Sequence, residues 1–272
     1  MASAPPEPPP EPLIVDAHAH ILTRRMPLRP DAWARPDYDY PVEAWLADMD
    51  AHGIAFGVLA AASLYGDYND YTLAALAQHK RLRATVMLDP GIDPTALRAM
   101  RDQGVVGVRF QWKPDAELPD LRGFDYAKFL NRLADLGMHV ELNCSGPQLH
   151  RLLPELGDRG IRVVVDHFGM LRSPGGMAGD GFRTMLAAVA GGQVWIKISA
   201  GFRLEPAQLR PCIERLLAEA GPERLMWGSD APFVGMEADM SYSGAVALFH
   251  DLVPAAALRR RISDTALRFY FF

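Results

Sequence analysis

Short runs of apolar residues alternate with longer amphipathic stretches along most of the chain. The short runs are rich in Val, Ile and Leu, a pattern typical of parallel β-strands that are buried on both faces. We predict eight strands, at residues 13–17, 55–60, 84–88, 105–110, 139–142, 163–166, 194–198 and 225–227.

The stretches between these runs have the periodicity of helices that bury one face. We predict helices at residues 42–52, 71–78, 95–102, 126–136, 149–156, 182–190 and 206–220. Eight strand–helix units in one chain of this length predict a (β/α)8 TIM barrel, in the α/β class. A doubly wound open sheet is the alternative, but no glycine-rich phosphate turn follows the first strand, which disfavours its dinucleotide-binding form.

Composition indicates one large domain. The chain has 272 residues, of which 49% are hydrophobic, and its formal net charge is -5. We assign residues 13–272 to the barrel and residues 1–12, which are rich in proline, to a disordered lead-in. The mild acidity gives no reason to expect a nucleic-acid partner, and no apolar run is long enough to span a membrane. Only two cysteines occur, so we expect a cytoplasmic protein with reduced thiols. We expect it to be a monomer or a homodimer.

The polar residues that follow the predicted strands are the candidates for chemistry, because catalytic groups of such barrels lie at the carboxyl ends of the strands. The first strand runs into His18 and His20, which are spaced to point to the same face. A lone histidine or aspartate after a strand is often only a hydrogen-bonded structural residue, but eight strands place many such residues at one end. These are His18, His20, Arg109, Asn143, Asp166, His167, Lys197, Ser199, Arg203 and Asp230.

Three motifs in this order resemble a known family. Val-Asp-Ala-His-Ala-His (15–20), Val-Asp-His-Phe-Gly (165–169) and Trp-Gly-Ser-Asp-Ala-Pro (227–232) are similar to those of the amidohydrolase superfamily. Within it, the chain resembles the amidohydrolase-2 branch of lactone-processing enzymes that includes 2-pyrone-4,6-dicarboxylate lactonase. The resemblance implies that the chain hydrolyses a lactone, with Asp230 as the base that activates water and His18, His20 and His167 polarising the carbonyl. It also implies a role in the breakdown of aromatic compounds.

Metal-dependent members of the superfamily usually add a lysine or carboxylate on strand four and a histidine on strand five. This chain has Arg109 and Asn143 at those positions, and neither is a good zinc ligand. We therefore expect no required cofactor. The alternative is one zinc ion held by His18, His20 and Asp230, with or without His167, in a mononuclear hydrolase or decarboxylase of the same superfamily.

The expected ligand is a small lactone or carboxylate. Arginines bind carboxylates through two parallel hydrogen bonds, and Arg109 and Arg203 match positions where the resembling lactonase holds its substrate. Asp115 stands where that enzyme has a further arginine, so a monocarboxylic, sugar-acid or muconate-type lactone is as good a candidate as the pyrone. A barrel that only binds a ligand would be expected to lack Asp230 or the histidine pair, and this chain keeps both. The predicted substrate-binding residues are Arg109, Arg203, Arg172, Asn143, Lys197, Ser63 and Tyr65.

Overall fold

The computed structural model describes residues 13–114, 116–170 and 175–272. The lead-in that we predicted at residues 1–12 and the predicted substrate-binding residue Arg172 lie outside these ranges. Within the described ranges no helix is both long and apolar enough to cross a membrane.

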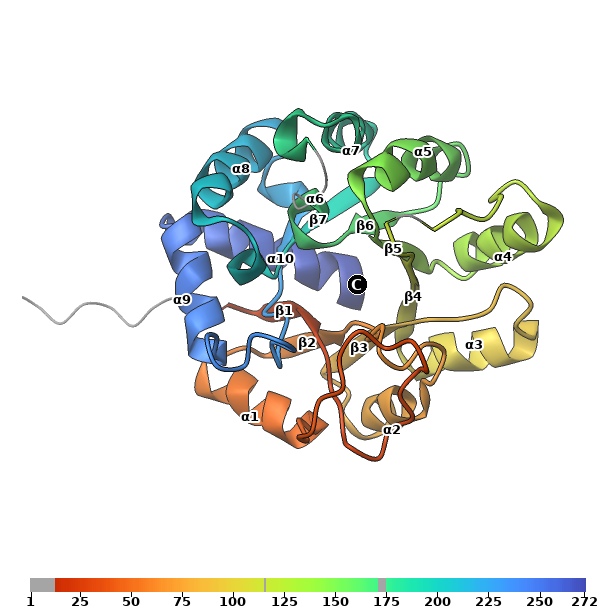
Figure 1. Ribbon diagram of the computed structural model, residues 1–272, viewed down its shortest axis with the longest axis horizontal. Helices are drawn as coiled ribbons and strands as arrows, with labels where there is room; N and C mark the ends of the chain where they lie inside the picture. The colour runs from red at the N-terminus through yellow and green to blue at the C-terminus, as the bar shows by residue number, and fades with distance from the viewer. Residues whose placement is uncertain (1–12, 115, 171–174) are drawn as a thin grey trace, which may run out of the picture.

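Eight parallel strands follow one another around a single sheet in the order of the sequence (Figure 1). This confirms the predicted (β/α)8 barrel. Backbone hydrogen bonds from Asp230 N to His18 O and from His20 N to Ala231 O join the segment after the last strand to the first. The strands are β1 (Val15–Ala19), β2 (Phe56–Leu59), β3 (Leu82–Val86), β4 (Val105–Gln111), β5 (His139–Asn143), β6 (Val163–Val165), β7 (Val194–Ile198) and β8 (Leu225–Trp227).

Helices surround the strands, as Figure 1 shows. Local signals in the sequence set several helix ends. Asp93 caps one helix by accepting from the N–H groups of Thr95 and Ala96, and Gly104 ends that helix in a left-handed conformation. The helices are α1 (Val42–Ala51), α2 (Asp70–Gln78), α3 (Pro94–Gln103), α4 (Phe124–Asp135), α5 (Gly146–Gly157), α7 (Asp180–Ala190), α8 (Pro206–Glu219), α9 (Tyr242–Leu252) and α10 (Ala256–Phe271), with short helical turns α6 (His167–Met170), η1 (Gly176–Ala178), η2 (Gly201–Arg203) and η3 (Pro222–Arg224).

The last helix covers the amino-terminal end of the barrel. Tyr270 on α10 is buried with Val15 and Val58 of the first two strands. His139, at the start of β5, stacks edge to face against the same Tyr270, with ring centroids 5.5 Å apart. Figure 1 places the carboxyl terminus near the middle of the barrel in this view. Because this end is filled by apolar and aromatic side chains, the carboxyl ends of the strands are left to form the site.

Candidate active site

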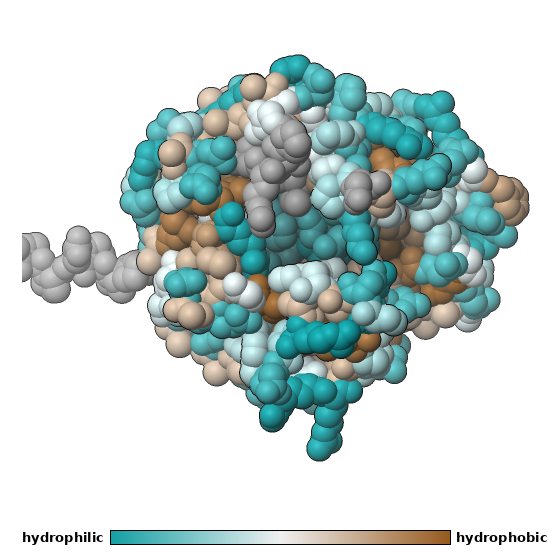
Figure 2. Space-filling model, viewed as in Figure 1, coloured by the Kyte–Doolittle hydropathy of each residue, from teal (hydrophilic) through white to brown (hydrophobic). Residues whose placement is uncertain are grey.

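A cavity of about 290 Å³ opens at the carboxyl ends of the strands. In the space-filling view this face is hollowed near its centre, with hydrophilic residues in the hollow (Figure 2). Its lining includes the predicted residues His20, Ser63, Arg109, Asn143, His167, Arg203 and Asp230.

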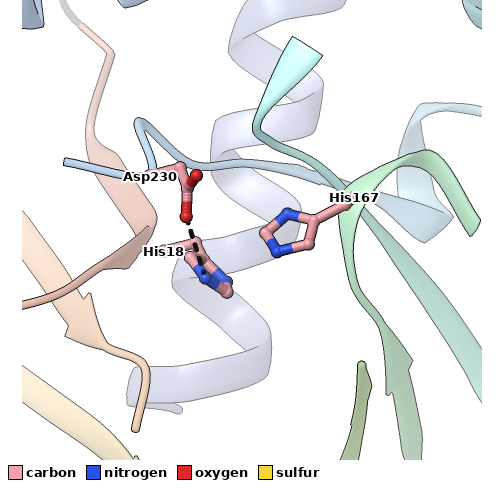
Figure 3. Close-up of side chains that lie close together, drawn as sticks. All are labelled: His18, His167 and Asp230. Carbon is pink, nitrogen blue, oxygen red and sulfur yellow. Dashed lines mark ion pairs between the residues drawn. The ribbon is translucent and has the colours of Figure 1, made fainter. Parts of the chain in front are cut away.

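Asp230 lines this cavity, and Figure 3 shows its carboxylate beside His18 and His167. Its Oδ1 is 3.6 Å from Nε2 of His18 and 3.4 Å from Nε2 of His20, and its Oδ2 accepts a hydrogen bond of 3.2 Å from Nε of Arg203. Burial by itself raises the pKa of this carboxyl, but its contact with His20 and the nearby His167 and His18 outweigh burial and hold the pKa well below its usual range. Asp230 is therefore an ionised carboxylate at neutral pH.

The backbone is turned sharply where these side chains leave their strands. His167 has a φ of 51° and Asp230 a φ of 61°, in the left-handed region that residues other than glycine rarely adopt. Such conformations are found mostly at functional sites, since the surrounding structure must hold them. Because of these turns, His167 is brought towards His18, with ring centroids 4.9 Å apart.

A buried carboxylate ties β1 to the segment that carries Asp230. Asp16 Oδ1 accepts from Ser229 N, and its Oδ2 accepts from Ser229 Oγ, Trp45 Nε1 and Tyr242 OH. Burial raises the pKa of Asp16, which these hydrogen bonds lower only in part. Sequence reasoning assigned Asp16 no role, although it stands inside the first motif.

Beneath the histidines, two cations and two carboxylates form a fully buried network at the core of the barrel. Lys197 Nζ is 2.5 Å from Glu141 Oε2 and 3.7 Å from Asp166 Oδ1. Arg109 donates from Nε to Asp166 Oδ2 at 2.9 Å and lies 3.1 Å from Glu141 Oε1. The formal charges cancel. Burial dominates the raised pKa of Glu141, whereas Arg109, His18 and Lys197 overcome burial at Asp166 and lower its pKa.

Sequence reasoning missed Glu141. A period-2 pattern along β5 places Glu141 on the same face as Asn143 and His139, so the signal was available. Functional residues were expected close to or beyond the strand ends, and Glu141 lies two residues before the end of β5.

Two members of the network contact Nδ1 of His18, and each favours a different tautomer of the ring. Lys197 Nζ is 3.1 Å from Nδ1 of His18, and a lysine ammonium can only donate, so this hydrogen bond leaves the ring proton on Nε2. Asp166 Oδ1 lies 3.3 Å from the same Nδ1 and favours the opposite arrangement, in which Nδ1 carries the proton. Burial is the main reason that the pKa of His18 is well below its usual value, so the ring is neutral at pH 7.

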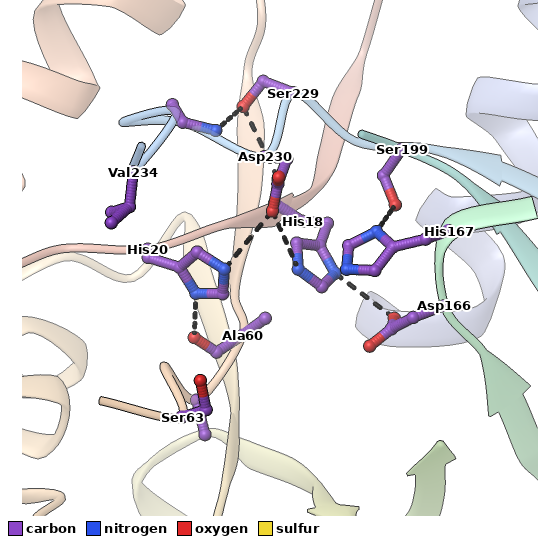
Figure 4. A network of polar contacts seen from close by, with 12 residues as sticks. His18, His20, Ala60, Ser63, Asp166, His167, Ser199, Ser229, Asp230 and Val234 are labelled. Carbon is purple, nitrogen blue, oxygen red and sulfur yellow. Dashed lines mark hydrogen bonds and ion pairs between the residues drawn. The ribbon is translucent and has the colours of Figure 1, made fainter. Parts of the chain in front are cut away.

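His20 has a fixed orientation for a different reason. Its Nδ1 lies 2.8 Å from the carbonyl oxygen of Ala60, which can only accept, so Nδ1 carries a proton. Nε2 then faces the carboxylate of Asp230 (Figure 4). A lone pair on Nε2 of His20 and one on Oδ1 of Asp230 would repel each other at 3.4 Å. This contact is therefore favourable when a proton or another cation lies between the two atoms.

The predicted substrate-binding residues are distributed over three environments. Arg203 and Asn143 line the cavity. Arg109 also lines it, but its guanidinium is held by Asp166, Glu141 and the carbonyl of Ala61. Lys197 is fully buried in the network and does not line this cavity.

Ser63 and Tyr65 follow β2 but separate from each other. Ser63 lines the cavity and accepts a hydrogen bond of 3.1 Å from Nε1 of Trp33. Tyr65 is buried beside Leu22 and Leu64 in a separate apolar cluster. The structure therefore brings Ser63, but not Tyr65, to the cavity wall.

The fold and the site define a (β/α)8-barrel enzyme with a centre of histidines and one aspartate. The amidohydrolase family profile matches residues 15–272, and the chain belongs to that family. This confirms the resemblance found in the sequence.

Relatives and solved structures agree with the family. The 4-sulfomuconolactone hydrolase of Hydrogenophaga intermedia is 27% identical over 257 residues, which cover 91% of this chain and 84% of the relative. The 2-pyrone-4,6-dicarboxylate hydrolase of Comamonas testosteroni is 27% identical, covering 94% and 90%. A Pseudomonas putida structure, provisionally named 2-pyrone-4,6-dicarboxylic acid hydrolase, is 35% identical with a TM-score of 0.84, covering 94% of this chain and 96% of that one.

The prediction that no cofactor is required is wrong, on two findings. An amidohydrolase of Burkholderia multivorans, with a TM-score of 0.78 and 22% identity over 95% of this chain and 99% of that one, was solved with bound zinc. In this chain, ligand atoms of His18, His167 and Asp230 lie within 4.8 Å of one another, as a metal site needs. The zinc alternative raised from the sequence used His18, His20 and Asp230, with or without His167, whereas the ligand atoms that lie together are those of His18, His167 and Asp230.

The donor set fits zinc. Nε2 of His18 is buried and has no hydrogen-bond partner among the described residues, and it faces Asp230. Two imidazoles and one carboxylate are a zinc ligand set that leaves a fourth position open. Asp166 can accept the Nδ1 proton of His18, which leaves the Nε2 lone pair free for a metal. A second group, His18 with Glu141 and Asp166, already encloses the Lys197 ammonium.

Proposed function

We propose that the protein hydrolyses a lactone of a small carboxylic acid, with Asp230 as the base that takes a proton from the attacking water. The observation that carries the proposal is the position of this ionised carboxylate, in the lining of the cavity and beside three imidazoles. The names of the lactone hydrolases that this chain resembles support the same reaction.

The proposed reaction begins when water gives a proton to Asp230 and its oxygen bonds to the lactone carbonyl carbon. Negative charge then develops on the carbonyl oxygen, and donors positioned for that charge stabilise it. In the ring tautomer that the contact with Lys197 favours, Nε2 of His18 is one such donor, and a metal ion bound at that nitrogen would take over this role. The ring C–O bond then breaks, and the leaving oxygen takes the proton from Asp230 to give a hydroxy acid.

A low pKa keeps Asp230 ionised but makes it a weak base, because a strong general base has a pKa near the working pH. Arg203 contributes to the site by binding Oδ2 of Asp230, which leaves Oδ1 towards His18 and His20. A zinc ion held by His18, His167 and Asp230 would polarise the lactone carbonyl and lower the pKa of the attacking water, which would suit a weak base.

Replacement of the carboxylate tests the proposal. We expect Asp230→Asn to lower kcat for lactone hydrolysis by about 10²- to 10⁴-fold, because an amide cannot accept the proton. Acid release from a panel of muconolactones, sugar-acid lactones and the pyrone dicarboxylate, followed in a pH-stat, gives the rate. Asp102→Asn, an exposed aspartate beside Arg101, is the matched control and should leave kcat unchanged.

Metal content is measured on the same samples by elemental analysis before and after dialysis against a chelator. Loss of activity with the metal and its return with added zinc would support a reaction that depends on the ion. Hydrolysis by Asp230→Asn within tenfold of the unaltered protein would eliminate Asp230 as the base.

A further inference from the structure

A second cavity of about 640 Å³ adjoins the first. Trp33, Ser63, Gln111 and Asn143 line both of them. We call the first the inner chamber and the second the outer chamber. Ligand pockets of enzymes commonly have volumes of about 300–1,000 Å³, so the inner chamber alone suits a small lactone. The outer chamber is then available to a substituent of the ring.

The charged side chains described in the outer chamber bind one another. Asp31 Oδ1 is 3.1 Å from Nε of Arg29, and Asp31 Oδ2 is 3.3 Å from Nζ of Lys113. The hydrogen bond from Lys113 is the main reason that the pKa of Asp31 is lowered, so the carboxylate stays ionised between the two cations. Every charged side chain that the structure describes in the outer chamber therefore already has an ion-pair partner there.

Aromatic surface is prominent in the outer chamber. Trp33 and Trp112 line it, and Trp33 is 61% exposed, although Nε1 of its indole is fixed by Ser63. A β-carbon on Gly235 would lie in ordinary van der Waals contact with Cζ3 of Trp33, at 3.6 Å, so the loop after β8 passes near the indole. An indole that lines a cavity and whose N–H is already bonded offers its flat apolar face to a ligand in that cavity.

We propose that the outer chamber is a second substrate subsite, which takes a flat, uncharged aryl arm of the lactone against the indole of Trp33. This inference rests on the proposed function, because the reacting ring must lie in the inner chamber beside Asp230. The chemical class is an aryl-substituted lactone. Asn143 and Gln111 line the passage between the chambers and offer amide groups to polar atoms of such an arm.

The test compares lactones that share one ring but carry hydrogen, phenyl or carboxyphenyl as the arm. We expect Trp33→Ala to lower kcat/KM for the phenyl lactone by about 10- to 30-fold relative to the unsubstituted one, the effect of uncovering roughly 60–80 Å² of apolar surface. Trp33→Phe should restore most of the preference. The matched control is Phe124→Ala, which removes an exposed aromatic ring that lines neither chamber.

Two results would overturn the subsite. One is an equal loss for both lactones in Trp33→Ala. The other is a preference for the carboxyphenyl arm that Lys113→Gln removes, which would identify an anion site instead.

Binding of the corresponding lactams, measured by calorimetry, separates this inference from the proposed function. Lactams replace the ester by an amide that resists hydrolysis. Tighter binding of the phenyl lactam that depends on Trp33, without hydrolysis of any lactone, would support the subsite and reject the lactonase. Equal binding of phenyl and unsubstituted lactams would reject the subsite even if lactones are hydrolysed.

Discussion

Replacing Lys197 by methionine tests the buried ion network directly. Lys197 Nζ and Glu141 Oε2 are 2.5 Å apart and both side chains are fully buried. At an effective dielectric constant of about 20, their Coulomb attraction is about 7 kcal/mol, and the desolvation of both ions cancels a large part of it. Because the formal charges of Lys197, Arg109, Glu141 and Asp166 sum to zero, removal of one leaves a net buried charge.

We expect Lys197→Met to lower the free energy of unfolding by about 3–5 kcal/mol, the usual result of leaving one partner of a buried pair. Glu141→Gln should have a similar effect, since it removes the carboxylate charge nearest to the Lys197 ammonium and leaves the network with one net positive charge. The double variant restores a net charge of zero. Its loss should be smaller than the sum of the single losses by about 2–3 kcal/mol.

The assay is urea unfolding of the four proteins at pH 7.5, followed by circular dichroism in the presence of a chelator, so that metal binding adds nothing. If a single variant fails to fold, recovery of cooperative unfolding in the double variant reports the same coupling. Losses that add to within 0.5 kcal/mol would refute the reasoning, because they would mean that Lys197 and Glu141 do not depend on each other.

Two further predictions concern pH and the approach of β8 to β1. Burial lowers the pKa values of His18, His139 and His167, so below about pH 6.5 the unfolded chain binds protons that the folded protein does not. In the absence of metal, the free energy of unfolding should therefore decrease as the pH is lowered, by up to about 1.4 kcal/mol per pH unit for each histidine. An unchanged free energy of unfolding between pH 7.5 and 5 would contradict this. A β-carbon at Gly228 would lie 2.4 Å from Cβ of His18 and 2.6 Å from the backbone nitrogen of His18. Gly228→Ala should therefore lower the free energy of unfolding by about 1–3 kcal/mol and kcat at least tenfold. A variant with normal activity and a normal melting temperature would show that the strands can separate without moving the site.

The order and type of the strands could be predicted from the sequence because each is a run of apolar residues bounded by polar segments. β7 and β8 have the predicted bounds, at Val194–Ile198 and Leu225–Trp227. Two other strands begin two residues away from their predicted starts, at Val15 in β1 and Leu82 in β3. Strand ends depend on pairing with neighbours, as in the contact of Val15 with Phe56, and a single apolar run carries no information about its partner.

Helix α9 (Tyr242–Leu252) was not among the predicted helices. Its first turn contains Ser243 and Gly244, which weaken the helical pattern. The Ser241 hydroxyl caps it by accepting from Gly244 N, and its buried face packs against the barrel through Phe249. Tertiary packing therefore decided this element where local propensity did not.

The candidate site was predicted unevenly. The sequence indicated that His18, His20, His167 and Asp230 belong together, and the structure places all four at one end of the barrel. The motifs in the sequence did not indicate that Lys197 lies beneath the cavity. A residue just before a strand end can face either the cavity or the interior of the barrel. Burial and the ion pairs with Glu141 and Asp166 account for its position.

By itself the sequence determined the barrel, its strand order, the family and the residue types at the strand ends, because each follows from local periodicity and short motifs. Only the tertiary structure decided which groups meet: His167 beside His18 and Asp230, Lys197 against Nδ1 of His18, and Trp33 between two chambers. The reason is physical. Metal ligation, ring tautomers and cavity walls depend on distances of a few ångströms between segments far apart in the chain, and those distances are set by strand register and packing.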